Sequence, residues 1–328
     1  MTEAITIDDI YAARDRLAGH ARVTPMLESP FINELAGRRV LIKAECLQRT
    51  GSFKFRGGWS AVSALPEDVR KRGVIAFSSG NHAQGVAHAA ELHGIPAVII
   101  MPNDAPALKL ANTAAHGAEV VTYDRPGGES REAAGAALAD ERGLTLIKPY
   151  DEPMVMAGQG TCGLEIAVQA REAGVSKADV LVCCGGGGLT SGIAMALEAE
   201  ARGLRVRPCE PEKGDDTKRS LETGARVSIN DPIPSICDAI VTPAPGELTF
   251  PITKRLCGPG LTVSDEEALK AMAHIFLRLK LVAEPGGAVA VASAIFRKEE
   301  IEGDAVICTI SGGNTDPEMF ARALATLG

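Results

Sequence analysis

The sequence predicts a two-lobe α/β protein in which helices cover parallel sheets. Strand-like and helix-like segments alternate along most of the chain, and 328 residues are more than most single compact cores hold. Several of the expected strands run directly into glycine-rich turns. Parallel strands need crossover connections, so this alternation favours sheets that are buried on both faces.

The first half of the chain begins with a helix. Thr6-Ile7-Asp8-Asp9 is typical of a capped helix start, and Ile10 and Leu17 follow at helical spacing. A short strand is expected over 40–43. The elements expected after it are strands over 73–77, 97–101 and 119–122 and helices over 82–93, 109–116 and 131–142.

The second half repeats the alternation. Strands are expected over 179–184, 204–209 and 305–310, and helices over 157–173, 189–202, 265–281 and 317–327. Residues 224–260 are proline-rich and weakly periodic, so we expect mostly loop there. Because no linker composition separates the lobes, we expect them to interleave: a discontinuous large domain of residues 1–68 and 152–328, and a small mobile domain of residues 69–151.

Composition narrows the range of partners and locations. The net charge of −8 argues against a nucleic-acid partner, which needs a basic face. No apolar run approaches the roughly 18 residues of a membrane span. The start of the sequence lacks the basic and apolar regions of a signal peptide, and the eight cysteines show no CxxC spacing. We therefore expect a cytoplasmic protein with reduced thiols.

The stretch from Thr50 to Gly57 places Lys54 between two aromatic residues, Phe53 and Phe55. Burial beside such rings lowers the pKa of an amine and makes it a nucleophile or base near neutral pH. The alternative is an ordinary amphipathic segment whose lysine reaches water.

Glycines follow the strand expected over 179–184 and lead into a helix. Such a turn lets the backbone approach a ligand, and the helix N-terminus offers N–H groups to a phosphate. The pattern is neither GxGxxG nor a Walker loop, which favours a single phosphate group over a dinucleotide. A simple tight turn is the alternative.

Two more turns of this kind follow strands. Ser78-Ser79-Gly80-Asn81-His82 offers hydroxyl, amide and N–H groups that suit a small anion such as a carboxylate, although Ser79 or Asn81 alone could be a helix cap. Ser311, in Ser311-Gly312-Gly313-Asn314, could meet a ring nitrogen.

Taken together, these motifs resemble the pyridoxal-phosphate enzymes of the threonine dehydratase and serine racemase family, which have fold type II. The resemblance runs from about Thr24 to Asn314 and includes Ala157-Gly158-Gln159-Gly160-Thr161 and Glu284-Pro285. It implies that the large domain binds the cofactor. The implied activity is β-elimination from a small β-hydroxy-α-amino acid such as serine or threonine, giving a 2-oxo acid and ammonia.

The resemblance also implies roles for individual residues. Lys54 would hold pyridoxal phosphate as a Schiff base and later move the Cα proton, and Phe53 would lie beside the ring. Asn81 would contact the 3′-oxygen, and Ser311 would pair with the pyridine nitrogen. The residues implied for the phosphate are Gly185, Gly186, Gly187, Gly188 and Leu189.

Substrate identity stays open within the family. Ser79 stands where serine racemases place a second base, or it anchors the substrate carboxylate with Ser78, Asn81 and His82. Arg131 and Tyr150, the latter at a position that varies within the family, make threo-3-hydroxyaspartate an alternative substrate, since Arg131 could pair with its second carboxylate. Serine racemisation and hydroxyectoine-pathway or phenylserine dehydration are further alternatives.

The stretch from Glu210 to Asp216 resembles the divalent-cation site of the family. Glu210, Asp216 and the Gly214 carbonyl would supply oxygen ligands, which suit Mg²⁺ or Ca²⁺. The alternative is an acidic surface turn. The resemblance also implies a homodimer.

Two other classes remain open at this point. One is a protein that binds a phosphorylated metabolite at residues 185–188 without catalysis. The other is a nicotinamide dehydrogenase, which the missing GxGxxG disfavours.

Overall fold

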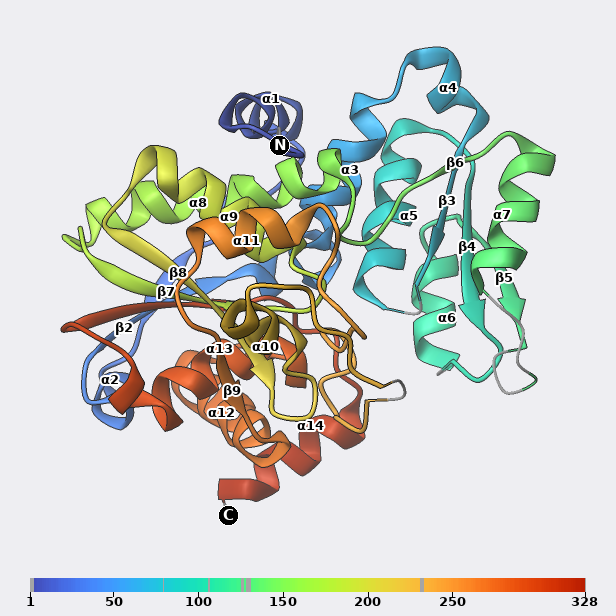
Figure 1. The fold of residues 1–328 in the computed structure, drawn as a ribbon. Coiled ribbons are helices and arrows are strands. Elements are labelled where there is room, and N and C mark those ends of the chain that lie inside the picture. The colour runs from blue at the N-terminus through green and yellow to red at the C-terminus, as the bar shows by residue number, and fades with distance from the viewer. Residues whose placement is uncertain are drawn as a thin grey trace.

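The structure is a computed structural model that describes residues 3–78, 80–105, 107–124, 127, 131–230 and 233–327. The side chains at 107–109 and 131–134 lie outside that description. Two sheets with helices on both faces make up the fold, as the sequence predicts (Figure 1).

The larger sheet has six strands, drawn from both ends of the sequence. All neighbours pair in parallel except β1, which is antiparallel to β2 at one edge. In spatial order the strands are β1 (Met26–Glu28), β2 (Arg39–Ala44), β10 (Ala305–Ile310), β7 (Ala178–Cys183), β8 (Leu204–Pro211) and β9 (Leu261–Val263).

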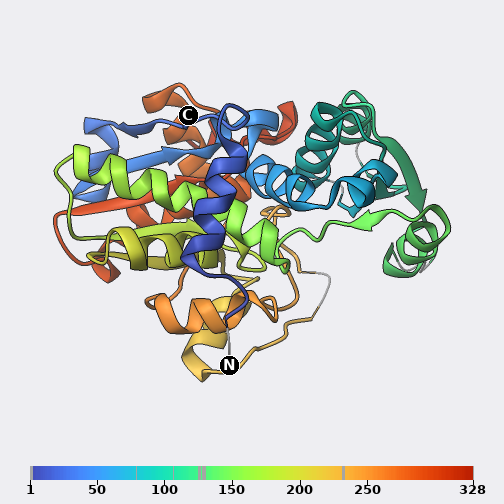
Figure 2. The ribbon, with the colours of Figure 1, turned by 90° about the horizontal axis from the view of Figure 1, so that it is seen from above.

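The smaller sheet has four parallel strands, all from one continuous part of the chain. In spatial order they are β5 (Glu119–Tyr123), β4 (Ala97–Pro102), β3 (Val74–Phe77) and β6 (Thr145–Leu146). Figures 1 and 2 show this part lying beside the larger sheet and its helices. The domain boundaries, and closure of the smaller part over a substrate, remain predictions.

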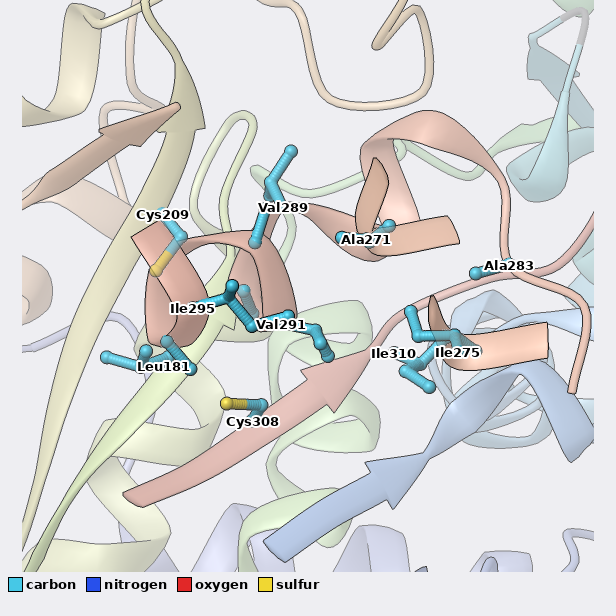
Figure 3. Packing of buried hydrophobic residues seen from close by; sticks show 14 of the residues in the cluster. Leu181, Cys209, Ala271, Ile275, Ala283, Val289, Val291, Ile295, Cys308 and Ile310 are labelled. Atoms are coloured by element: carbon cyan, nitrogen blue, oxygen red, sulfur yellow. The ribbon is translucent and has the colours of Figure 1, made fainter. Parts of the chain in front are cut away.

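Alternating side chains of the central strands bury both faces of the larger sheet. Leu181 and Cys308 pack under α2, α12 and α13, as Figure 3 shows for part of this cluster. Val180 and Ile307 point to the opposite face and pack under α8 and α9. The helices named are α2 (Pro30–Ala36), α8 (Pro153–Glu172), α9 (Gly188–Glu200), α12 (Asp265–Leu279) and α13 (Pro285–Phe296).

The smaller sheet is covered in the same way. Its strands pack on one face against α3 and α5 and on the other against α7. The remaining described helices complete the fold. Their bounds are α1 (Ile7–Leu17), α3 (Lys54–Ala64), α4 (Glu67–Arg72), α5 (Asn81–His93), α6 (Ala107–Ala114), α7 (Arg131–Arg142), α10 (Asp216–Thr223), α11 (Thr249–Leu256) and α14 (Pro317–Leu324).

Several predicted boundaries are wrong by a few residues, for local reasons. α8 begins at Pro153, because the Glu152 carboxylate accepts hydrogen bonds from the N–H groups of Met154 and Val155 and so caps the helix. α12 ends at Leu279, because Lys280 adopts a left-handed conformation with φ +60°.

The prediction of mostly loop over 224–260 is wrong for Thr249–Leu256, which forms α11. All eight cysteines are unpaired in the structure. Among the described helices, none is both long and apolar enough to cross a bilayer.

A buried group of four charges joins β2, α3 and α8. Arg56 donates to both carboxylate oxygens of Glu45, at 2.7 and 2.8 Å, and to both of Glu165, at 2.6 and 2.9 Å. Lys43 Nζ lies 2.6 Å from Glu165 Oε2. Burial alone would raise the pKa of Glu45, but Arg56 and Lys43 hold it below its ordinary value. Two cations thus balance two carboxylates directly after the start of α3.

Arg56→Leu should therefore lower the free energy of unfolding by about 3–5 kcal/mol, because it leaves two buried carboxylates with one cation. The matched control is Arg142→Leu, which breaks the exposed Arg142–Glu119 pair and should cost at most about 1 kcal/mol. Urea denaturation measures both. Equal losses in the two variants would contradict a structural role for the buried group.

Candidate active site

A cavity of about 520 Å³ lies where β3, β7 and β10 end. Its walls are formed by the segments that follow these strands and by residues 238–243. Asn81 and Gly188, the first residues of α5 and α9, both line it. Two helix N-termini at one cavity present N–H groups and positive dipole ends, so the site favours anionic groups.

Lys54 reaches this cavity from the start of α3. Its Nζ donates a hydrogen bond to the Pro149 carbonyl at 2.8 Å and lies 5.1 Å from the centre of the Phe53 ring. Burial lowers the pKa of the Lys54 amine to about 8, although the charge of Glu284 opposes that shift. A sizeable fraction of the amine is therefore unprotonated at neutral to mildly alkaline pH.

The segment before Lys54 is fixed by the segment after β10. The Phe53 N–H donates to the Ser311 carbonyl at 3.1 Å, and the Gly313 N–H donates to the Gly51 carbonyl at 2.9 Å. These backbone bonds bring together two parts of the sequence that are far apart. The start of α3 therefore has a defined position relative to the end of β10.

The turn over residues 185–189 forms a cradle at the start of α9. Gly187 has φ +91°, which favours glycine, and a Cβ on Gly186 would lie 2.2 Å from the Tyr150 ring. Thr190 Oγ1 is buried with no nitrogen or oxygen partner among the described residues. A hydroxyl without a nitrogen or oxygen partner in this part of the structure, beside helix N–H groups, fits a phosphate.

Asn81 is oriented by two neighbours. Its Nδ2 donates to Glu284 Oε1 at 2.6 Å, and its Oδ1 accepts from Asn314 Nδ2 at 2.7 Å. These bonds connect α5, which covers the smaller sheet, to the segment before α13 and the segment after β10. The amide of Asn81 therefore faces the cavity in a fixed orientation.

His82 is neutral. Its Nε2 lies 2.8 Å from the Ile147 carbonyl, which can only accept, so Nε2 carries the proton. Burial and the charge of Lys54 lower the pKa of His82 to about 3. Its Nδ1 is buried without a partner among the described residues. His82 can therefore accept a hydrogen bond, but it adds no charge to the cavity.

Most of the predicted site residues meet at this cavity. Ser311 is buried beside Cys183, and Cys183 lines the cavity. Ser79 lies outside the described residues; Arg131 begins α7, but its side chain is not among those described. The predicted residues that line the cavity are Phe53, Lys54, Ser78, Asn81, His82, Tyr150, Gly185, Gly186, Gly187, Gly188 and Leu189. The roles assigned to them remain predictions.

Glu210 and Asp216 form a second polar site, between β8 and α10. The carboxylate of Glu210 accepts the N–H groups of Thr217 and Lys218 at 2.9 and 2.7 Å. Both carboxylate oxygens of Asp216 are buried, and within the described part of the chain they have no partner outside their own residue. Gly214 lies in the intervening turn.

Burial raises the pKa of Asp216 to about 7. Burial and the charge of Asp216 together raise the pKa of Glu210 well above its ordinary value. Two buried carboxylates of this kind fit a hard divalent cation.

Sequence reasoning assigned no role to Glu284, Asn314, Thr190 or the Pro149 carbonyl. The sequence does carry a signal for Glu284, which precedes Pro285 at a helix start, and for Thr190, which is the third residue of the helix after the glycines. Sequence carries no signal for the Pro149 carbonyl, because a backbone acceptor depends on the path of the chain alone.

The chain is similar to known proteins over nearly its whole length. The family model described as pyridoxal-phosphate dependent enzyme matches residues 17–313. The L-threo-3-hydroxyaspartate ammonia-lyase of Saccharomyces cerevisiae is 43% identical over 98% of this chain and 96% of its own. The crystal structure of the T.th. threonine deaminase has a TM-score of 0.89 at 44% identity, over 95% and 99% of the two chains. Maize serine racemase has a TM-score of 0.90 at 33% identity, over 99% and 98%.

The lowered pKa of Lys54 predicts how fast the amine reacts with an aldehyde. Because the unprotonated amine attacks, the rate at which cofactor-stripped protein takes up pyridoxal phosphate should rise with pH and level off above about 8. A lysine of ordinary pKa would keep accelerating towards about 10.4. Stopped-flow absorbance measures the rate. A rate that still climbs tenfold per pH unit above 9 would contradict the burial of this amine.

Proposed function

Because the chain belongs to the pyridoxal-phosphate dependent enzyme family, we propose that it is an ammonia-lyase for small β-hydroxy-α-amino acids such as serine or threonine. The β-hydroxyl group leaves as water, and the amino group leaves as ammonia after a second water molecule is consumed. The products are a 2-oxo acid and ammonia, and the atoms balance without an oxidant. The observation that carries the proposal is the Lys54 amine in a cavity that also contains the glycine cradle of residues 185–189.

The site fits pyridoxal phosphate. The cradle with the Thr190 hydroxyl would hold the phosphate, Phe53 would lie against the ring, and Lys54 would bind the aldehyde carbon. Asn81 would contact the 3′-oxygen of the ring, and Ser311 would pair with the pyridine nitrogen. When bound, this cofactor withdraws electrons from the substrate Cα and so makes the Cα proton removable.

Residues of this chain would accept the Cα proton of the substrate and bind its carboxylate. Lys54 is the one Lys or Arg among the described residues that line the cavity, and its lowered pKa allows Nζ to accept the Cα proton near neutral pH. The N-terminus of α5 supports binding of the substrate carboxylate, with Ser78 beside it. Neutral His82 orients polar groups there without adding charge.

A hydroxyaspartate substrate is the second candidate. Its motivation is Arg131, at the start of α7 in the smaller part, together with the names of relatives such as the yeast enzyme above. A cation that pairs with the second carboxylate would discriminate against serine, which lacks that group. Racemisation through Ser79 is a further possibility for side activity. The homodimer and the cytoplasmic location remain predictions.

The test is a 2-oxo-acid assay of the purified holoenzyme over serine, threonine, phenylserine and the 3-hydroxyaspartate stereoisomers. We expect turnover of at least one of them and its loss in Lys54→Ala, because no other amine lines the described cavity. A colourless protein without a borohydride-reducible adduct at Lys54 would overturn the enzyme function altogether.

Arg131→Ala in the same assay separates the two substrate candidates. If Arg131 pairs with the second carboxylate, kcat/KM for hydroxyaspartate should fall at least about tenfold more than that for serine. The matched control is Arg142→Ala at the other end of α7, which should leave the ratio unchanged. Equal losses on both substrates would remove Arg131 from substrate selection.

We also propose that Glu210, Asp216 and the Gly214 carbonyl bind Mg²⁺ or Ca²⁺, with a structural role. The raised carboxylate pKa values mean that protons compete with the cation, so affinity should increase as pH rises through about 7. Removing the cation above that pH leaves two buried charges unpaired.

A chelator should therefore lower the melting temperature more at about pH 8 than at about pH 6, and Mg²⁺ or Ca²⁺ should restore it. Asp216→Asn should be insensitive to the chelator, whereas Asp215→Asn, the neighbouring carboxylate, should respond like the original protein. An identical melting temperature with and without chelator at both pH values would leave Glu210 and Asp216 as an acidic turn.

A further inference from the structure

Three side chains outside the active-site cavity converge on one point in the smaller part of the molecule. The Nδ1 atoms of His88 and His116 lie 2.8 and 3.0 Å from the same carboxylate oxygen, Oε2 of Glu91. The two imidazole rings are 4.7 Å apart between centres. None of the three residues lines the cavity described above.

Two segments supply these groups. His88 and Glu91 are three residues apart on α5, so their side chains share one face of the helix. His116 follows α6, in a turn where its N–H donates to the Thr113 carbonyl at 3.2 Å. The side chains of His88, Glu91 and His116 are 16%, 45% and 26% exposed, so an ion in solution can reach them.

The cluster is already arranged for coordination. The His88 ring packs against Phe55, with 5.4 Å between ring centres, which limits its rotation. A carboxylate is ionised at neutral pH, and both histidine Nδ1 atoms lie within hydrogen-bond distance of the same oxygen of Glu91. One anionic oxygen thus lies between two imidazole nitrogens.

The distances suit a small cation. Zinc binds imidazole nitrogen and carboxylate oxygen at about 2.0–2.2 Å, so two of its tetrahedral ligands lie about 3.3–3.5 Å apart. The observed 2.8 and 3.0 Å therefore need to lengthen by only a few tenths of an ångström. To bind the ion, each neutral imidazole would present the lone pair of Nδ1 and carry its proton on Nε2. The proton would move from Nδ1 to Nε2 by exchange with water.

We propose that His88, Glu91 and His116 form a binding site for Zn²⁺ or a similar borderline divalent cation. Two imidazoles and one carboxylate leave a fourth position for water. Nitrogen ligands distinguish this site from the oxygen-only pair Glu210 and Asp216, which suits Mg²⁺ or Ca²⁺.

The cation fastens α5 to the turn after α6. α5 also carries Asn81 and His82, which line the active-site cavity, and Phe55, beside His88, follows Lys54 directly. Binding therefore stabilises the part of the molecule that supports one wall of the cavity. Because a ligating imidazole must be unprotonated, affinity falls as pH falls.

The experiment is calorimetric titration of ZnCl₂ into the holoenzyme in the presence of excess Mg²⁺, with the melting temperature measured alongside. We expect one Zn²⁺ per chain and a higher melting temperature. Zn²⁺ affinity should drop at least about tenfold in His116→Gln. Glu91→Gln, whose side chain is 45% exposed, provides a second variant should the first fail to fold.

His20→Gln is the matched control, since His20 is exposed and lies outside the cluster, and it should bind as the original protein does. Co²⁺ in place of Zn²⁺ should give the intense visible bands of a four-coordinate ion in the original protein and lose them in Glu91→Gln. The proposal is overturned if no equivalent of Zn²⁺ binds. Unchanged Zn²⁺ binding in both His116→Gln and Glu91→Gln would also overturn it, because the ion would then be bound elsewhere, for example at thiols. Loss of binding only in Asp216→Asn would overturn it too, because the ion would then be bound at the Glu210–Asp216 site.

Discussion

The buried pairing of Arg56 with Glu45 and Glu165 is the constraint on which the active-site geometry depends. Arg56 lies two residues after Lys54 in the first turn of α3, and its partners come from the end of β2 and from α8. If α3 were displaced, two or more buried charges would lose their ion-pair partners, which costs several kcal/mol. The group therefore fixes α3 in one position, and the amine of Lys54 with it.

Burial shifts the pKa values of four groups at the active-site cavity and at the Glu210–Asp216 site, and the direction and size of each shift depend on the neighbouring charges. The charge of Glu284 opposes the shift at Lys54, whereas no carboxylate among the described residues opposes the shift at His82, which stays neutral. Glu210 and Asp216 face no cation among the described residues that could offset their burial, so their pKa values rise. Burial thus makes the Lys54 amine a base near neutral pH and makes Glu210 and Asp216 a carboxylate pair that suits a divalent cation.

The sequence allowed the alternation of strands and helices, the Lys54 stretch and the three turns to be predicted, because each depends on local pattern. It did not reveal α13, since a helix that is apolar on every side has no periodicity, nor α11, whose neighbours are rich in proline. The bond from Asn81 to Glu284 joins residues 203 positions apart. The pairing of Phe53 with Ser311 likewise depends on tertiary packing alone, which a pattern of residues cannot show.

The position of β10 between β2 and β7 has a consequence for the order of folding. A ribosome produces β2 and β7 well before β10, yet neither can pair with the other without it. The sheet therefore stays open while most of the chain is being made, with apolar strand edges exposed that favour aggregation. Pairing over so long a sequence separation is also slow. The larger sheet therefore closes only late in synthesis, in contrast to the smaller sheet, whose strands come from one continuous part of the chain and can pair as soon as they emerge.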